Sequence, residues 1–411
     1  MDDALIARGL KRTPLPRFLL WLLPWVGVLA FGLYAVYRCF AYGLNQTNMD
    51  NRFAFGLWIY LDLTVIALGA GAFFTGFLLY ILKRKELKAV INSAVVIGFI
   101  CYSGAVGILM VDVGQPLRAW FTFWHPNVHS MLTEVTFCIT IYLCVLAIEY
   151  LPLVLKNRRL SEVPGLLVLE HQLHKLMVVF AGVGTLLSFF HQGSLGGLYG
   201  VLRGNPFAYR EHIFIWPTTF FLFVLSAAAV GPSFILLTTW LVGKITRKQL
   251  VAPEVLQTLA KISGGLLLVY VVLKGIDSLV WLNSTSPQTG VQVSSFYANP
   301  PFGVQVLFAE VVLLGLVPAV LLLSRRVRAR TGLLVAVAAT ACAGIVLNRY
   351  VMTIQTLALP SLPFDSFASY TPSWQEVAAF LAVLGYGVLL YSISFRWLNL
   401  FPQERELATK G

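Results

Sequence analysis

Four titratable side chains lie in or beside four consecutive long apolar segments of the chain: Asp62, Asp112, Glu134 and His191. An ionisable group inside a membrane-spanning helix costs about 3 kcal/mol or more, so each is a candidate functional residue. Each also falls toward the same end of its segment. The pattern therefore predicts one proton-handling pocket that all four side chains share.

The segments that hold these residues indicate a polytopic membrane protein. The chain of 411 residues is 58% hydrophobic and only 12% charged, and its mean hydropathy is +0.78. A hydrocarbon core of roughly 30 Å needs about 20 helical residues, and backbone polar groups inside lipid must be satisfied within the helix. The ten predicted spans are 18–37, 54–82, 89–111, 128–150, 172–194, 213–243, 254–281, 303–323, 332–356 and 374–398.

Lys and Arg are distributed unevenly between the two sides of the predicted membrane. Most of the 30 gather at the termini and in the even-numbered loops. The odd-numbered loops hold only Arg38, Arg52, Arg118, Arg203 and Arg210. The positive-inside rule then places both termini in the cytoplasm and the four titratable residues in the outer third of the membrane. The net charge of +12 reflects topology, and we expect no nucleic-acid partner.

Spans 2–5 and 6–9 resemble one another, although weakly. Residues 132–135 resemble residues 308–311, and Asp112 near the end of span 3 has a counterpart in Asp277 near the end of span 7. Units with an even number of spans form parallel repeats about the membrane normal. We predict an all-α protein with two four-helix bundles related by a pseudo-twofold axis, plus two peripheral helices. The predicted parts are 1–53 (N-terminus and helix 1), 54–200 (first bundle with the site), 201–360 (second bundle) and 361–411 (helix 10 and C-terminus).

Two predicted external loops carry many aromatic or glycine residues, at 112–127 and 193–212. Aromatic residues form belts at membrane interfaces without any further function. The same surface beside titratable groups would also suit an amphipathic ligand. The run from Asp112 through Gly114 to Pro116 is typical of a helix end.

Protonatable groups beside apolar and aromatic side chains suit the head group of a quinone. Quinone reduction consumes two protons with two electrons, so the site needs hydrogen-bond donors near the carbonyls and a carboxylate or imidazole as relay. Structural roles stay open. Asp112 could cap a helix end or pair with Arg118, and Glu134 could hold an interhelical hydrogen bond as a neutral acid.

A second polar group lies toward the predicted cytoplasmic side: Glu149, Glu170, His171, His174 and Lys175. Such residues often form a rim whose long side chains reach the interface. The functional alternative is the mouth of a proton path that leads up to Glu134.

The second predicted bundle holds its own charged residues. Lys274 and Asp277 are spaced i,i+3 and could pair on one helix face, with Glu310 and Arg349 in later spans. They form either structural ion pairs or a second pathway.

Three other functions compete with quinone chemistry. A b-type haem needs facing His pairs at one depth, and His171 lies about 30 Å from His191 along one helix, which leaves only His129 with His191. Because only this one His pair is left, we expect no haem in this chain. The five cysteines are scattered without a CxxC, so we expect no iron–sulfur cluster either. A secondary transporter would show helices broken at the midplane, whereas we expect the breaks at the outer interface. The outer cluster argues against a purely structural anchor.

Several runs of residues are similar to the integral membrane subunits of the NrfD/polysulfide-reductase family, and together they span nearly the whole chain. These runs are 55–63, 111–114, 127–130 with Glu134, 191–194 and 371–376. The resemblance implies a haem-free subunit of a bacterial inner-membrane complex, inactive alone and surrounded by membrane lipids, that binds menaquinone near the periplasmic face. It also implies a periplasmic iron–sulfur partner subunit, with molybdopterin-type, multihaem cytochrome c or hydrogenase subunits beyond it.

The resemblance also assigns roles by position. His191 and Asp112 become quinone-site residues, and Asp62 and Glu134 a proton relay. The quinone-binding set further includes Gln192, Arg118, Asn127 and Ser130. Since some relatives are proposed to move protons across the membrane, a candidate path runs through Glu134, Glu149, His171 and His174.

Overall fold

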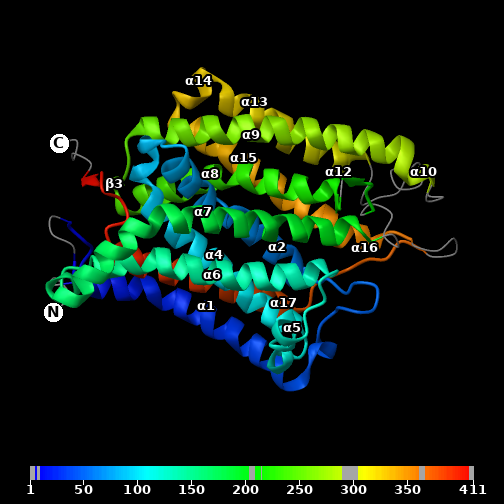
Figure 1. The fold of residues 1–411 in the computed structure, drawn as a ribbon, viewed down its shortest axis with the longest axis horizontal. Helices are drawn as coiled ribbons and strands as arrows, with labels where there is room; N and C mark the ends of the chain where they lie inside the picture. Colours follow the sequence, from blue (N-terminus) through cyan, green and yellow to red (C-terminus); the bar gives the residue numbers. More distant parts are fainter. Residues whose placement is uncertain are drawn as a thin grey trace.

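The computed structural model describes residues 5–6, 10–202, 209–213, 215–288, 304–360 and 366–406. Within these residues ten helical segments are long and apolar enough to cross a membrane, which confirms the predicted all-α polytopic class. They run side by side along the long axis of the molecule (Figure 1). The segments are α1 (Leu15–Tyr42), α2 and α3 (Leu57–Gly69 and Gly71–Gly76), α4 (Ile91–Asp112), α6 (Met131–Leu155), α7 (Pro164–Gly200), α8 (Thr218–Thr246), α9 and α10 (Pro253–Val280 and Ser286–Gln288), α12 and α13 (Val304–Phe308 and Val317–Leu323), α15 and α16 (Thr331–Tyr350 and Thr356–Ala358) and α17 (Trp374–Trp397).

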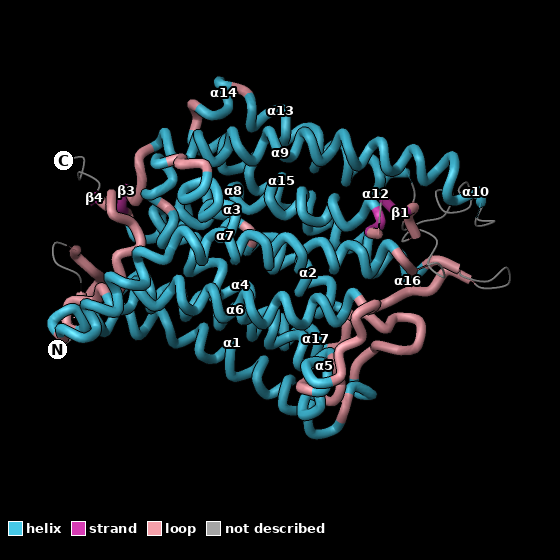
Figure 2. Tube along the Cα trace, viewed as in Figure 1, coloured by secondary structure: helices cyan, strands magenta, loops and turns pink. Residues whose placement is uncertain are grey.

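Four of the spans contain a π-helical stretch, a feature that occurs often at functional sites. These stretches are Phe77–Ile81, Trp281–Thr285, Ala309–Leu316 and Val351–Gln355. Short elements connect the spans (Figure 2). They are α5 (Phe121–Trp124), α14 (Arg325–Arg328), the 3₁₀ turns Leu44–Gln46, Lys85–Ala89, Pro116–Arg118 and Leu160–Glu162, and the strands β1 (His212–Ile213), β2 (Trp216–Pro217), β3 (Lys248–Gln249) and β4 (Arg405–Glu406).

Most consecutive spans pack against each other. Helix α2 contacts α4, α4 contacts α6, α6 contacts α7, α7 contacts α8, and α8 contacts α9. Helix α8 also contacts α2, α3 and α15, and α13 contacts both α9 and α15. Helix α1 packs against α17, which in turn contacts α4 and α2. The predicted division into two four-helix bundles related by a pseudo-twofold axis stays a prediction.

Both ends of the described chain lie at the same end of the helix array (Figure 1). Arg12 forms an ion pair with Glu404, whose Oε1 also lies 2.5 Å from Lys248 Nζ. Strand β3, between α8 and α9, pairs antiparallel with the C-terminal strand β4. We call this end the terminal side and the other end the opposite side.

Part of the predicted loop 193–212 is instead helical, because α7 continues to Gly200. The glycines there serve close helix packing. A Cβ at Gly193 would lie 2.2 Å from the Phe220 ring, and one at Gly196 would lie 2.3 Å from the Thr219 carbonyl oxygen. Small residues that let two backbones approach are common where membrane helices pack. The prediction of a loop from the glycine-rich composition is therefore wrong for residues 193–200. Residues 203–208 of the predicted loop lie outside the described part of the chain.

The expectation that helix breaks lie at the outer interface stays a prediction. In span 2 the α-helical hydrogen-bond pattern changes at Ala70, between α2 and α3. Ala70 itself keeps the right-handed helical φ and ψ of −58° and −19°, and the span continues as one helical segment, Leu57–Ile81. The glycines on either side of Ala70 lower helix propensity there.

Candidate functional site

Helix α2 carries two buried polar side chains one turn apart. Trp58 is fully buried and Asp62 is 2% exposed. Their i,i+4 spacing places both on one helix face. Asp62 lies within electrostatic reach of Asp112 on α4, and of two buried tyrosines, Tyr102 on α4 and Tyr199 on α7.

Asp112 is the last residue of α4, and the expected helix end is confirmed. The chain leaves the helix through Gly114, whose φ of +71° favours glycine. The Asp112 carboxyl lies within reach of the Trp58 indole and of the charge of Glu376 on α17. Three elements far apart in the sequence therefore meet around this carboxyl.

His191 lies on α7 and is fully buried. Its ring centroid is 5.7 Å from that of Tyr102, and Tyr102 packs edge-on against Tyr142 with centroids 4.5 Å apart. The Tyr102 hydroxyl shares a 2.8 Å hydrogen bond with Ser188 Oγ, one turn before His191. The imidazole is therefore held among aromatic rings rather than in a polar, solvated setting.

Several buried side-chain atoms around Asp62, Asp112 and His191 form no hydrogen bond of good geometry within the described residues. Most buried polar groups in proteins are satisfied by protein or ordered water, so such a concentration is a feature expected of a ligand or water site. The atoms are Trp58 Nε1, Asp62 Oδ1, Asp112 Oδ1, Tyr142 Oη, Gln192 Nε2, and both His191 nitrogens. Three of these groups have a polar neighbour close by without a well-formed hydrogen bond: Trp58 near the Asp112 carboxyl, Gln192 near the Tyr102 hydroxyl, and His191 near the Val135 backbone.

The cluster offers the groups that a quinone reaction requires. The indole and amide N–H groups can donate to a carbonyl oxygen, and imidazole and carboxyl groups can exchange protons with it. Aromatic side chains surround them: Tyr199 meets Phe55 edge-on at 5.5 Å and stacks on Phe223 at 6.4 Å. We call Trp58, Asp62, Asp112, His191 and Gln192 the acid–imidazole cluster.

Glu134 lies beside this cluster rather than inside it. It is in the first turn of α6, is partly exposed, and its backbone N–H donates to the Ser130 carbonyl at 3.3 Å. Its carboxyl lies within reach of Ser194, one turn after His191 on α7. A side chain there can connect the surface with the His191 region.

The other predicted quinone-binding residues lie outside the buried cluster. Arg118 and Asn127 are exposed, and Ser130 is partly exposed at the start of α6. Asn127 Oδ1 accepts a hydrogen bond from the His129 backbone N–H at 3.0 Å, which stabilises the turn before α6. These residues lie on the opposite side of the molecule, and their role in quinone binding stays a prediction.

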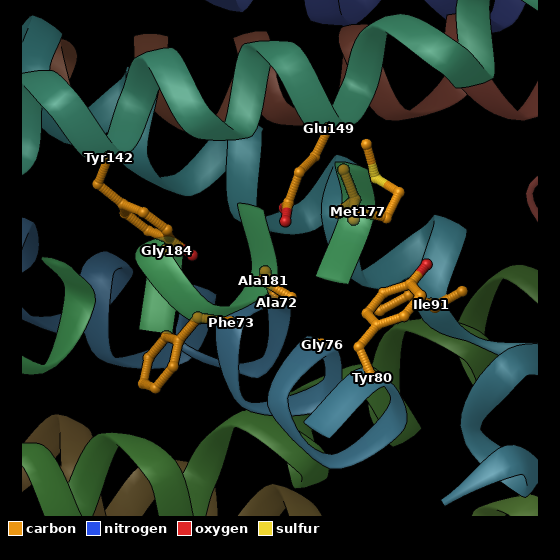
Figure 3. Close-up of a pocket in the computed structure, with 11 residues that line it drawn as sticks. Ala72, Phe73, Gly76, Tyr80, Ile91, Tyr142, Glu149, Met177, Ala181 and Gly184 are labelled. Carbon is orange, nitrogen blue, oxygen red and sulfur yellow. The ribbon is translucent and has the colours of Figure 1, made fainter. Parts of the chain in front are cut away.

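A small cavity lies between the cluster and the terminal side. Figure 3 shows Glu149 and Tyr142 reaching from α6 toward α7 and α3, with Tyr80 facing them from below. It leaves about 20 Å³ for water, which is enough for a molecule or two. Because Tyr142 contacts Tyr102, the cavity adjoins the aromatic side of His191.

The two histidines of the predicted proton path are at the surface. His171 and His174 are exposed on the first turns of α7, and His174 lies near Lys88 and Lys156. Lys156 pairs with Glu170 at 3.1 Å. Of Glu149, His171 and His174 on the predicted proton path, only Glu149 lines the interior cavity.

Lys274 and Asp277 do not pair with each other, contrary to one expectation from their spacing. Lys274 forms an ion pair with Glu310, while Asp277 binds Arg210 at 2.9 Å and accepts a hydrogen bond from Thr218. A buried charge requires a partner in direct contact, and neighbouring segments supply one for each.

The Lys274 pair continues into a buried chain of polar groups. Asn348 Nδ2 donates to Glu310 at 2.7 Å, and Arg349 donates to Asn348 Oδ1 at 2.7 Å. Arg349 is 1% exposed, and its guanidinium lies 3.8 Å from the centroid of the Phe223 ring. Since Phe223 stacks on Tyr199, this chain ends beside the acid–imidazole cluster.

Sequence reasoning missed Trp58, Tyr102, Tyr199 and Glu376 as site residues. Two signals could have found some of them. Trp58 precedes Asp62 by one turn, and Tyr199 follows His191 by eight residues, which is close to two helical turns. Tyr102 carries no such signal.

In the described ranges, no three His, Cys, Asp or Glu side chains gather as a metal site. All five cysteines are free thiols.

Comparison with known proteins gives four findings. The family model described as "Polysulphide reductase, NrfD" matches residues 45–360. A menaquinone reductase integral membrane subunit of Nitratidesulfovibrio vulgaris is 49% identical over 411 residues, which covers 100% of this chain and 98% of the relative. A probable Ni/Fe-hydrogenase 2 b-type cytochrome subunit of Escherichia coli is 26% identical, covering 89% and 88%. A selenate reductase subunit of Mesobacillus selenatarsenatis is 21% identical, covering 92% and 93%.

Proposed function

The chain belongs to the polysulphide reductase NrfD family, and on that premise we propose that it is the quinone-binding membrane subunit of a respiratory oxidoreductase complex. The substrate is menaquinone. The observation that carries the proposal is the acid–imidazole cluster, where buried donors and acceptors that form no hydrogen bond of good geometry lie close together in the interior of the helix array. The menaquinone reductase relative supports the choice of quinone.

Menaquinone reduction adds two electrons and two protons and forms two hydroxyl groups. The electrons come from, or return to, an iron–sulfur partner subunit on the periplasmic side, with molybdopterin-type or multihaem cytochrome c subunits beyond it. This chain binds and orients the quinone and supplies its protons. His191 and Gln192 hold the head group, while Asp62 and Asp112 exchange protons with its oxygens and Glu134 connects them to the surface.

The proposed orientation places both termini in the cytoplasm of a bacterial cell and the cluster near the periplasm. Arg118, Asn127 and Ser130 then lie at the mouth through which the head group enters. Glu149, with the water-sized cavity beside it, is placed to receive protons from the cytoplasmic side, together with His171 and His174 at the surface. Turnover would then draw protons through the membrane interior.

The test uses the purified complex and quinone turnover with a soluble menaquinone analogue. We expect His191→Ala to lower turnover by about 100-fold, and Glu134→Gln by a smaller factor, because each removes a proton-transfer group. His125→Ala is the matched control, since His125 is exposed in the outer loop. Wild-type turnover in both site variants would exclude the proposed pocket. Coupled uptake of a solute by proteoliposomes without quinone would favour a transporter instead.

A b-type cytochrome is the second candidate, because the relative from Escherichia coli carries that description. In this chain His191 is buried while His129 is exposed, so the one remaining candidate pair does not share an environment. A pyridine haemochrome assay on the purified subunit separates the two candidates. We expect no b-type signal, and a stoichiometric signal would establish haem.

A further inference from the structure

Glu376 is a buried carboxylate in the first turn of α17 with an unusually full set of donors. It is fully buried, and its two oxygens accept five hydrogen bonds. Oε1 accepts from the backbone N–H and the hydroxyl of Ser373, both at 3.0 Å, and from the Asn48 N–H at 3.4 Å. Oε2 accepts from the Leu57 N–H at 3.0 Å and from the Tyr370 hydroxyl.

Only the Ser373 bonds belong to the start of α17 itself. Ser373 and Glu376 form a capping box, in which each side chain bonds the backbone N–H of the other. The remaining bonds run to other segments, and such a cap does not need them. Asn48 lies before α2, and Leu57 is the first residue of α2.

The contact with α2 is close and directional. The Leu57 N–H points at both Glu376 Oε2 and the Tyr370 oxygen, which is 2.8 Å away. A Cβ at Gly56 would lie 2.6 Å from Glu376 Oε2, so only glycine there lets the carboxylate approach. A negative group at a helix N-terminus is also favoured by the helix dipole.

The hydrogen bond from the Leu57 N–H to Glu376 fixes the start of α2, and α2 carries two members of the acid–imidazole cluster. Trp58 follows Leu57 directly, and Asp62 is one turn further along. Fixing the first N–H of a helix fixes the rotation and height of its first turns. The Glu376 carboxyl also lies within electrostatic reach of the Asp112 carboxyl at the end of α4.

We infer that Glu376 is a positioning residue of the quinone site: through Leu57 it holds α2 so that Trp58 and Asp62 face the quinone head group. The inference rests on the proposed function. It assigns a role to the 371–376 run, and places part of the site's support on a helix outside the residues 45–360 that the family model matches.

The test measures binding of menadione, the menaquinone head group without its tail, to the purified complex. Glu376→Asp keeps a carboxylate that can cap α17 but shortens its reach to Leu57. Tyr370→Phe keeps Glu376 and removes one donor at the same oxygen. We expect the Kd for menadione to rise by about tenfold in Glu376→Asp and by less in Tyr370→Phe, with normal complex assembly. Glu254→Gln, which alters the first-turn acid of α9, is the control with unchanged Kd.

A double-mutant cycle separates positioning from a purely structural role. If Glu376 acts through α2, Glu376→Asp weakens binding little further in an Asp62→Asn background, because the contact it supports is already lost. Additive effects, or wild-type Kd in both Glu376→Asp and Tyr370→Phe, would overturn the inference. Failure of the proposed function looks different: Asp62→Asn and His191→Ala would then leave menadione binding unchanged.

Discussion

The His191 ring lies 5.7 Å from the Tyr102 ring, and the Tyr102 hydroxyl is bonded at 2.8 Å to Ser188 on the same helix as His191. Tyr102 thus restrains the position of the imidazole from α4. The sequence indicated His191 as a site residue, but it did not indicate Tyr102.

Tyr102→Phe removes the hydroxyl but keeps the ring against His191. We expect quinone turnover to fall by about tenfold, less than for His191→Ala, because one hydrogen bond is lost while the packing remains. Steady-state turnover of the purified complex measures it. Tyr386→Phe is the matched control, since Tyr386 forms an equivalent 2.8 Å bond with Ser103 between α17 and α4. Equal losses in both variants would contradict a specific role for Tyr102.

Glu149→Gln removes the titratable group from the cavity beside Tyr142. We expect slower quinone turnover with an unchanged Kd for menadione, because the cavity serves proton delivery and not head-group binding. Stopped-flow proton uptake with a pH indicator, alongside the binding assay, checks both expectations. Glu162→Gln changes an exposed acid on the same side and provides the control. A weakened Kd with normal proton uptake would assign Glu149 to binding instead.

Lys274→Met leaves the buried Glu310 carboxylate without its ion-pair partner. We expect a loss of about 3–5 kcal/mol in the free energy of unfolding, since breaking a buried pair exposes an uncompensated charge. Replacing both residues, as Lys274→Met with Glu310→Met, should recover part of that loss. Denaturant unfolding in detergent measures each variant. A double variant less stable than Lys274→Met would contradict the expectation that the loss comes from the unpaired Glu310 carboxylate.

Tyr370 gives a prediction for alkaline pH. Burial, together with its hydrogen bond to Glu376, raises the pKa of Tyr370 above its ordinary value. A raised pKa contributes stability that is fully present below the unfolded value of about 10 and is lost as the pH rises above it. The stability difference between wild type and Tyr370→Phe should therefore be constant from pH 6 to 9 and shrink above about pH 10. Thermal unfolding across that range tests it, and a change near neutral pH would contradict the expectation.

The spans were predictable because lipid enforces long apolar helices, and a polar residue within them stands out. Asp62, Asp112 and His191 stand out in this way, and in the structure Asp62 and Asp112 lie within electrostatic reach of each other. The helix end after Asp112 also followed from local sequence, through Gly114.

Other features depend on contacts that local sequence does not encode. The glycines from Gly193 to Gly200 suit a loop equally well until Phe220 and Thr219 are known to pack against them. The spacing of Lys274 and Asp277 suggested a pair, but facing segments offered each a better partner. Glu376 had a readable signal, since Ser373 three residues earlier indicates a capping box. Its bond to Leu57, 319 residues away in the sequence, had none.

The pairing of α1 with α17 has a consequence for biosynthesis. Helix α1 can meet its packing partner only after α17 has been synthesised, and Arg12 can meet Glu404, 392 residues later, only after that. Until then α1 rests against lipid or an insertion factor. Truncations that remove α17 should therefore release α1 first, and any insertion that delays the synthesis of α17 prolongs the interval in which the chain is open to degradation.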